Sequence, residues 1–228
     1  MSTADAILAE LERRQNADNR AGMARYGINV ANAYGVPVSE LRRMAKGLGR
    51  DQALAQALWA TDVHEARLLA TIIAEPGAVT RDELERWAGD LDSWDLTDGF
   101  TSNLVRHTPH AWACVDAWCD DGREFVRRAG FSLLAQLVVS DKRAGDEAFR
   151  AHLPRIHAAA ADERNMVKKS VNWALRQIGK RSVDLNAAAI AEAEALTAGP
   201  GKAARWIGRD ALRELRSDKV QARLATRR

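Results

Sequence analysis

The sequence predicts an all-α fold, and three observations support this. The chain is rich in Ala, Leu, Arg and Glu, which favour helix. Strand signals are nearly absent, because the only β-branched cluster, at residues 138–140, ends a run with helical spacing. Apolar residues recur at helical intervals in short segments that Gly or Pro separates from one another.

These periodic segments define the expected helices, in chain order. The helices lie near residues 3–17, 20–34, 38–48, 51–59, 62–74, 80–89, 93–107, 110–119, 122–139, 144–160, 163–180, 184–197 and 201–216. Proline stands at or near expected helix starts, as Pro37, Pro76, Pro109, Pro154 and Pro200. Glycine marks the breaks between segments, at Gly35, Gly77, Gly122, Gly145 and Gly199.

Short helices joined by short loops predict stacked antiparallel helix pairs. The helix–turn–helix spacing of roughly 35–45 residues is in the range of HEAT-like or armadillo-like repeats, which form an α-α superhelix, or solenoid. A compact globular bundle is the alternative with the same helices. We expect a single solenoid domain over residues 1–228, with the basic tail after about residue 217 frayed.

Composition excludes several classes of protein. The 228 residues carry 34 Lys and Arg against 31 Asp and Glu, so the formal charge is only +3 and does not identify a nucleic-acid partner. No apolar run approaches the roughly 18 residues of a membrane span, and the N-terminus does not resemble a signal peptide. Cys114 and Cys119 offer neither a disulfide framework nor metal spacing. We therefore expect a soluble, cytoplasmic protein.

One expected helix, residues 163–180, carries a second stripe beside its core face. On a helical wheel the apolar positions, such as Val171 and Leu175, cluster on one side. Lys169, Trp173, Arg176 and Lys180 follow at i, i+4, i+7 and i+11 and share another surface. This stripe is either a solvated basic edge or a ridge that binds phosphate and sugar with a stacking ring.

The segment DSWDLTD, residues 92–98, places an aromatic and an acidic residue together away from the core. Leu96, Phe100 and Leu104 define the core face, whereas Trp94 and Asp98 share another face with Thr101 beside them. Asp92 or Ser93 is expected to cap the helix, and Asp92 and Asp95 to complement its dipole. Asp98 lies one turn further along, where that explanation is weaker.

An arginine pair follows in the segment at residues 121–134. Arg127 and Arg128 are both expected to lie away from the core face of their helix. Three roles are open for the pair: a solvated surface, bidentate binding of phosphates, or an ion pair with the Asp98 carboxylate.

Other candidate sites are weaker. His107, His110, His152 and His157 lack partners at metal spacing, so no metal site is expected. Patterns typical of a hydrolase elbow, a Walker loop or a dinucleotide fold do not occur.

Four segments resemble, in order, the AlkD-like DNA alkylation repair family of HEAT-like-repeat DNA glycosylases. They are MARYG (23–27), DSWDLTD (92–98), FVRRAGFSLLA (125–135) and NMVKKSVNWALRQIGKRS (165–182). ARWIGRDALRELR (204–216) is similar to the terminal helix of many members. The resemblance implies an α-solenoid whose concave basic face holds duplex DNA. It also implies excision of N3- or N7-alkylated purines, with no cofactor.

The resemblance assigns roles by motif. Asp98 resembles the catalytic carboxylate, Trp94 and Trp173 the aromatics that face the lesion, and Tyr26 the aromatic that closes the site. Arg128 resembles the arginine that clamps the DNA backbone. We expect Arg127, Lys169, Arg176 and Lys180 to contact the DNA backbone as well. Some relatives have a second aromatic immediately before the motif Trp, whereas this chain has Ser93.

Three functions follow as hypotheses. The first is a monofunctional alkylpurine DNA glycosylase that works as a monomer on double-stranded DNA, associates with the nucleoid when bound, and reads the lesion along the concave face. The second is a non-catalytic HEAT-repeat paralogue that recognises damaged or branched DNA. The third is a protein–protein scaffold. For the first, we expect Trp94, Asp98, Arg128 and Trp173 to converge in one groove.

Overall fold

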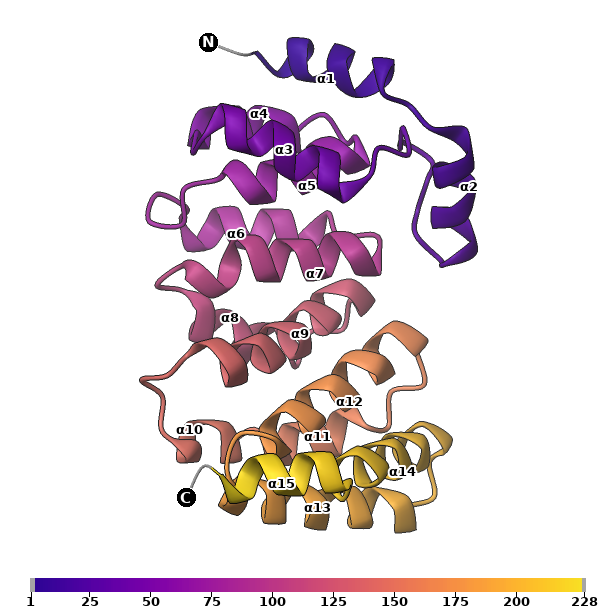
Figure 1. Ribbon diagram of the computed structural model, residues 1–228, viewed down its shortest axis with the longest axis vertical. Helices are drawn as coiled ribbons and strands as arrows, with labels where there is room; N and C mark the ends of the chain where they lie inside the picture. The colour runs from indigo at the N-terminus through magenta and orange to yellow at the C-terminus, as the bar shows by residue number, and fades with distance from the viewer. Residues whose placement is uncertain (1–2, 227–228) are drawn as a thin grey trace. The chain divides into compact units, whose positions relative to one another are not determined.

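The fold is all-α, as predicted. A computed structural model describes residues 3–226, and within that range it contains α-helices and one short 3₁₀ helix but no strand (Figure 1). The helices are α1 (Ala4–Arg13), α2 (Ala17–Arg25), α3 (Val38–Leu48), α4 (Gln52–Trp59), α5 (His64–Ile73), α6 (Arg81–Gly89), α7 (Trp94–Asn103), η1 (Val105–His107), α8 (Ala111–Trp118), α9 (Glu124–Ser140), α10 (Asp146–Arg150), α11 (Leu153–Ala159), α12 (Asn165–Gly179), α13 (Val183–Ala198), α14 (Lys202–Leu215) and α15 (Asp218–Ala225).

The chain divides into two compact units. Unit 1 comprises residues 1–111 and unit 2 residues 112–228. The single solenoid domain that we expect over residues 1–228 stays a prediction.

In unit 1, side-chain contacts between successive repeats recur at a constant sequence offset. Three hydrogen bonds, Tyr34 N–H to Glu65, Trp59 to Asp90, and His64 to Asp95, each join residues 31 positions apart. The offset arises because each repeat places equivalent helices against one another. The repeat in unit 1 is therefore somewhat shorter than the expected spacing.

A buried aromatic cluster holds α4, α6 and α7 together in unit 1. The rings of Trp59 and Trp87 stack with centroids 4.2 Å apart, and Phe100 of α7 lies 5.8 Å from Trp59. Phe100 is fully buried. Such ring pairs contribute about 0.5–1.5 kcal/mol each beyond their buried area, so this cluster fixes the core face of α7.

In unit 2, α12 and α14 run side by side in a fixed register. Lys168 lies over Trp206, Asn172 donates to Asp210, and Arg176 donates to Glu214, each pair with the same offset of 38 residues. A constant offset means that the two helices run in the same direction along this contact. The predicted core stripe of α12 is confirmed, because Val167, Val171, Ala174, Leu175 and Ile178 are all fully buried.

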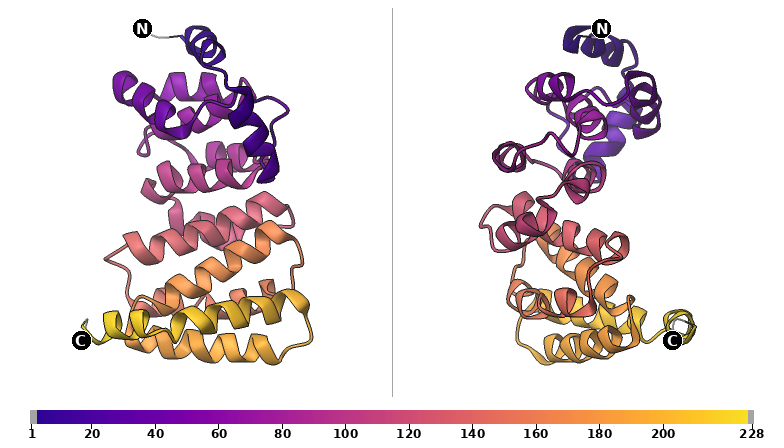
Figure 2. Two further views of the ribbon diagram at one scale, coloured as in Figure 1. Left: turned by 45° about the vertical axis from the view of Figure 1, so that its right-hand side comes forward. Right: turned by 90° about the vertical axis from the view of Figure 1, so that its left-hand side faces the viewer.

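Helix α13 covers α14 from the other side, and the two lie next to each other in Figure 2. Gly208 permits this close approach, because a Cβ atom there would lie 2.4 Å from the carbonyl oxygen of Ala193.

The predicted helix over 20–34 is wrong beyond Arg25. Gly27 and Gly35 both have positive φ, which breaks the helical path. The Glu65 carboxylate accepts hydrogen bonds from the backbone N–H groups of Tyr34, Gly35 and Val36 at 3.0, 2.6 and 3.1 Å. This buried carboxylate satisfies donors that a helix would otherwise have used.

Two further expectations differ from the structure. The segment 144–160 forms two short helices rather than one, and Pro154 lies in the first turn of the second. The expectation that the tail after residue 217 is frayed is wrong up to Ala225, where α15 ends. That helix buries Val220 and Leu224, and Gln221 donates to the carbonyl oxygen of Leu215.

Candidate functional site

The first group of candidate residues lies at the start of α7 in unit 1. Ser93 is the N-cap residue by position, but its hydroxyl makes no capping bond and instead donates to Asp92. Trp94 and Asp98 follow one turn apart and are half-buried, whereas Leu96 and Phe100 are buried in the core. The predicted placement of Trp94 and Asp98 off the core face is confirmed. Thr101 is instead buried, and its hydroxyl donates to backbone carbonyls of α7.

Tyr26 is brought to this group from the end of α2. The indole Nε1 of Trp94 donates a hydrogen bond to the backbone carbonyl of Tyr26 at 3.0 Å. The Tyr26 ring is 77% exposed. The backbone of the 26–28 turn therefore holds the Trp94 ring, while the Tyr26 ring faces solvent.

A contact between buried His64 and half-buried Asp95 supports the first turn of α7. Nε2 of His64 lies 2.9 Å from a carboxylate oxygen of Asp95, and His64 is buried. Burial lowers the pKa of His64, but the hydrogen bond and charge of Asp95 outweigh it, so the pKa of His64 is raised above its usual value. Asp95 thus does more than complement the helix dipole.

A small polar cavity adjoins this pair. It has a volume of about 50 Å³, and its lining includes His64, Asp92 and Asn29. Asn29 donates to Asp92 at 2.6 Å, which ties the loop after α2 to the residue before the N-cap of α7. Sequence reasoning missed His64 and Asn29, because neither belongs to a motif. The 31-residue offset between His64 and Asp95 is the signal that would have found the pair.

The second group lies in unit 2, where α9 meets α12. Nη1 of Arg128 donates to the carbonyl oxygen of Met166 at 3.0 Å, and Arg128 is only 6% exposed. Arg127 is half-buried and pairs with Asp162 at 3.1 Å. The expectation that both arginines lie away from the core is wrong for Arg128, because its face of α9 packs on the first turn of α12. Both guanidinium groups are positioned by hydrogen bonds within unit 2.

Only part of the predicted stripe on α12 pairs with the neighbouring helix α14. Lys169 is exposed and Trp173 is half-buried. Arg176 and Lys180, in contrast, both bind Glu214, at 2.8 and 2.7 Å. Burial raises the pKa of Glu214, but the hydrogen bonds and charges of Lys180 and Arg176 outweigh it, so the pKa of Glu214 is lowered. The stripe of four residues that we predicted therefore does not present all its charges to solvent.

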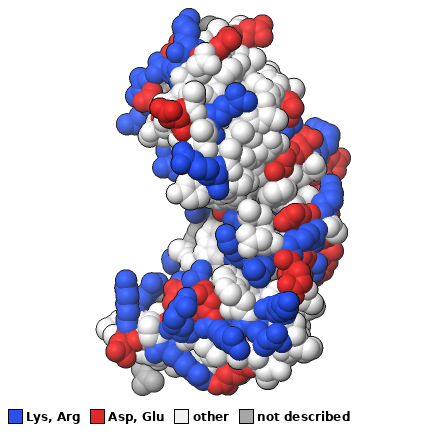
Figure 3. Space-filling view, turned by 90° about the vertical axis from the view of Figure 1, so that its right-hand side faces the viewer, with Lys and Arg blue, Asp and Glu red and all other residues white. Residues whose placement is uncertain are grey.

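The surface charge of unit 2 is nevertheless uneven. Figure 3 shows Lys and Arg side chains gathered toward the bottom of one face, at the level where Figure 1 draws α14 and α15. On α14, exposed Lys202 and Arg209 line one open cavity together with Arg205 and Arg213. The net charge of +3 thus conceals a local concentration of cations.

Two of the other histidines, both in unit 2, have structural partners. His152 is buried and stacks on Trp112, and His157 pairs with Glu192 at 2.6 Å. Between residues 3 and 226, no three His, Cys, Asp or Glu side chains are grouped as metal ligands would be. Over the same residues, no helix has the length and apolarity needed to cross a bilayer.

Comparison with models of protein families shows the family to which the chain belongs. The family model described as "DNA alkylation repair enzyme" matches residues 7–215. The chain belongs to this family. The resemblance seen in the motifs of residues 23–27, 92–98, 125–135 and 165–182 is thereby confirmed.

Comparison with solved structures supports the same fold. One structure aligns with a TM-score of 0.80 over 98% of this chain and 96% of its own, at 20% sequence identity. It is described as representing a new family of proteins related to the HEAT-like repeat DNA glycosylases with affinity for branched DNA structures. The predicted HEAT-like helical-repeat fold is therefore confirmed. A comparison with curated proteins found no match.

Proposed function

We propose that the protein is a monofunctional DNA glycosylase that excises cationic N3- or N7-alkylated purines from duplex DNA. The observation that carries the proposal is the pairing of Trp94 and Asp98 on adjacent turns of α7, off the core face. The hydrogen bond from Trp94 to the Tyr26 carbonyl and the contact of Asp95 with His64 support it, because they fix the first turn of α7, one turn before Asp98. A preorganised carboxylate beside an aromatic ring suits a reaction in which positive charge develops on a sugar.

The chemistry needs few groups. An alkylated purine with a positive charge is already a good leaving group, so no general acid has to protonate it. The N-glycosidic bond breaks with its electron pair leaving on the base, and positive charge develops on the sugar. The Asp98 carboxylate stabilises that charge and orients a water molecule, whose oxygen bonds to C1′ as its proton leaves to Asp98 or to solvent.

The remaining candidate residues bind rather than react. The rings of Trp94 and Trp173 meet the cationic nucleotide through cation–π contacts of about 1–2 kcal/mol each when desolvated. Tyr26 closes the site beside Trp94. Lys169 contacts phosphates, joined by Arg127, Arg176 and Lys180 when DNA competes with their carboxylate partners, while buried Arg128 holds the first turn of α12 in place. In this proposal the protein acts as a monomer.

The proposal is tested by base release. Duplex DNA treated with a methylating agent is incubated with the protein, and free 7-methylguanine and 3-methyladenine are measured by chromatography. Release above the rate of spontaneous depurination supports the proposal, and release no faster than in the absence of protein contradicts it.

A second function is favoured by a different observation. The solved structure with the same fold is described in terms of affinity for branched DNA, and Ser93 occupies a position at which some relatives carry an aromatic residue. A non-catalytic protein that binds damaged or branched DNA would have the same basic surfaces. It would bind a four-way junction more tightly than a linear duplex and release no base.

A further inference from the structure

The exposed face of α14 combines a tryptophan with cations. The buried side of this helix consists of small and aliphatic residues, namely Ala203, Ala204, Ile207, Gly208, Ala211 and Leu215. Trp206 lies on the other side and is 40% exposed. Tryptophan usually seeks burial, so its place on the solvent side of a helix with a complete apolar face indicates a role outside packing.

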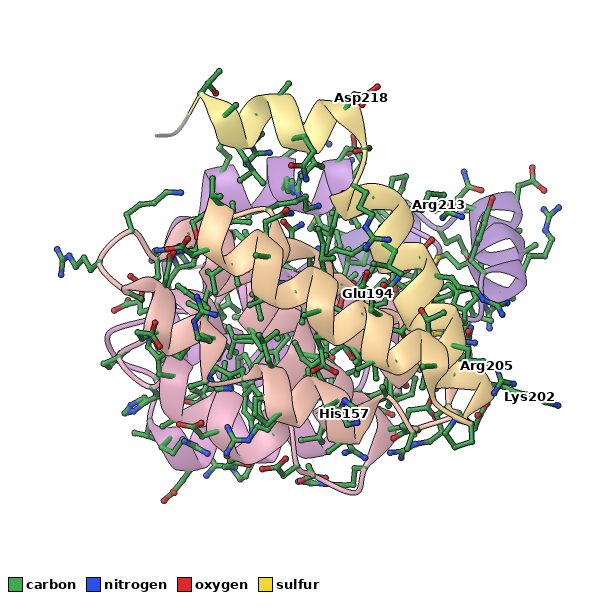
Figure 4. The ribbon with its side chains drawn as sticks, turned by 90° about the horizontal axis from the view of Figure 1, so that it is seen from below. His157, Glu194, Lys202, Arg205, Arg213 and Asp218 are labelled. Carbon is green, nitrogen blue, oxygen red and sulfur yellow. The ribbon has the colours of Figure 1, made fainter. Side chains whose placement is uncertain are left out.

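Cations flank Trp206 along the same face. Lys202, Arg205, Arg209 and Arg213 lie at spacings of three, four and seven residues, which bring them to one side of a helix. Together with Trp206 and Asp210 they line an open cavity of about 420 Å³. Figure 4 shows Lys202 and Arg205 at the start of α14 and Arg213 further along it. We call Lys202, Arg205, Trp206, Arg209 and Arg213 the α14 surface.

The charges of this surface are only partly neutralised. Asp210 is its one carboxylate, and it pairs with Arg213 and accepts a hydrogen bond from Asn172 at 2.7 Å. Arg205 donates to the carbonyl oxygens of Gly199 and Pro200, and no carboxylate between residues 3 and 226 forms an ion pair with it. Lys202 and Arg209 are exposed, and no ion pair to either occurs among the described residues.

Helix α12 adds a cation beside the ring. Nζ of Lys168 lies 5.0 Å from the centroid of the Trp206 ring. This cation–π contact holds the indole in one orientation, so less conformational entropy is lost when a ligand stacks on it.

We infer that the α14 surface binds an unpaired DNA strand, with a base stacked on Trp206 and the adjoining phosphates on Lys202 and Arg209. An aromatic ring set among cations is the arrangement that proteins use for single strands, because every base has a π-face and every nucleotide has a phosphate. Lys202 and Arg209 are about 10 Å apart along the helix axis, with Trp206 between them. In a duplex the base faces are covered by stacking, so only an unpaired nucleotide offers one to Trp206.

This inference goes beyond base excision, since it concerns neither Asp98 nor the stripe on α12. A second DNA surface would let the protein hold a strand end, gap or branch near a duplex. It does not require that the protein be a glycosylase.

Binding of a fluorescein-labelled thymidine 12-mer, followed by fluorescence anisotropy, tests the inference. Trp206→Ala is expected to weaken binding about 5- to 100-fold, whereas Trp206→Phe, which keeps an aromatic face, retains most of it. Arg209→Ala weakens binding and makes the slope of log K against log salt shallower by about 0.7. Arg42→Ala, an exposed arginine on α3, is the matched control and leaves binding unchanged. The melting temperature of each variant verifies folding.

Three outcomes overturn the inference. One is wild-type affinity in folded Trp206→Ala, and a second is equal loss in Trp206→Phe and Trp206→Ala. The third is an acidic peptide, such as a glutamate 12-mer, that binds the wild type through Trp206 while the oligonucleotide does not. Base release by Trp206→Ala is measured in parallel. If Trp206→Ala releases base at the wild-type rate but no longer binds the 12-mer, the α14 surface is distinct from the excision site. If neither the wild type nor any variant releases base, only the glycosylase proposal is contradicted.

Discussion

The indole Nε1 of Trp94 donates a hydrogen bond to the backbone carbonyl of Tyr26, 3.0 Å away and 68 residues earlier in the chain. This bond joins the end of α2 to the first residue of α7. It explains why two motifs that are far apart in sequence, residues 23–27 and 92–98, meet in one place. It also fixes the orientation of the ring that we propose to face the lesion.

Trp94→Phe tests this bond. Phenylalanine keeps an aromatic face but has no N–H, so the Tyr26 carbonyl loses its donor. We expect the free energy of unfolding, measured with urea, to fall by about 0.5–1.5 kcal/mol, and base release to fall with it. Trp112→Phe, which removes a similar bond to Asp141 in unit 2, is the control that should lose stability without the same loss of base release. Equal base release by Trp94→Phe and wild type would argue against a role for the ring's orientation.

The ion pair of His64 and Asp95 predicts a pH dependence of stability. The pKa of His64 is raised in the folded state, so folding favours the protonated imidazole. Its contribution to stability is complete below the unfolded value of about 6.5 and is lost as the pH rises through the higher folded value. In urea titrations at pH 5.5, 7.0 and 8.5, the wild type should therefore exceed Asp95→Asn most at pH 5.5. A difference that grows with pH would contradict this assignment.

Replacement of glycine by alanine is expected to have opposite effects on stability at Gly99 and at Gly47. A Cβ atom at Gly99 would lie 2.8 Å from Cδ2 of Leu68, so Gly99→Ala forces the buried Leu68 side chain of α5 to shift. We expect a loss of about 1–3 kcal/mol in the free energy of unfolding. Gly47 of α3 has no neighbour within 4 Å of a Cβ atom, so Gly47→Ala should stabilise by about 0.5–1 kcal/mol. Stabilisation by both substitutions would show that α7 and α5 are not held in this close contact.

Removal of the Glu214 carboxylate is expected to increase the affinity of the protein for DNA. Glu214→Gln removes the carboxylate that binds Arg176 and Lys180, so each of these two cations of the α12 stripe loses one ion-pair partner. Affinity for duplex DNA should rise several-fold at low salt, and its salt dependence should become steeper. Glu192→Gln on α13 changes the charge equally but frees only His157. If both variants gain the same affinity, the gain reflects net charge, and the α12 stripe does not contact phosphates.

The helical period allowed much of each helix to be predicted. The buried stripe of α12 and the placement of Trp94 and Asp98 off the core follow from residues on a single helix. Arg128 could not be placed in this way, since its burial depends on the backbone of Met166 in α12. Likewise, the non-helical path of residues 34–36 depends on Glu65, whose carboxylate accepts hydrogen bonds from their N–H groups.

Charge pairing across helices was the other part that sequence did not reveal. Lys180 and Arg176 have the spacing of a phosphate-binding ridge, yet Glu214 lies opposite both of them, 34 and 38 residues further along the chain. A wheel of one helix contains no information about the facing helix. The repeat offset, 31 in unit 1 and 38 between α12 and α14, supplies that information once it is known.

We propose that Asp98 is the catalytic carboxylate, and the rate of 7-methylguanine release by Asp98→Asn decides whether it is. Single-turnover release from methylated duplex DNA is compared for wild type, Asp98→Asn and Asp82→Asn, an exposed aspartate of α6 that serves as the matched control. We predict a loss of about 100-fold or more for Asp98→Asn, with unchanged DNA affinity and an unchanged rate for Asp82→Asn. Release by Asp98→Asn at the wild-type rate would contradict the claim.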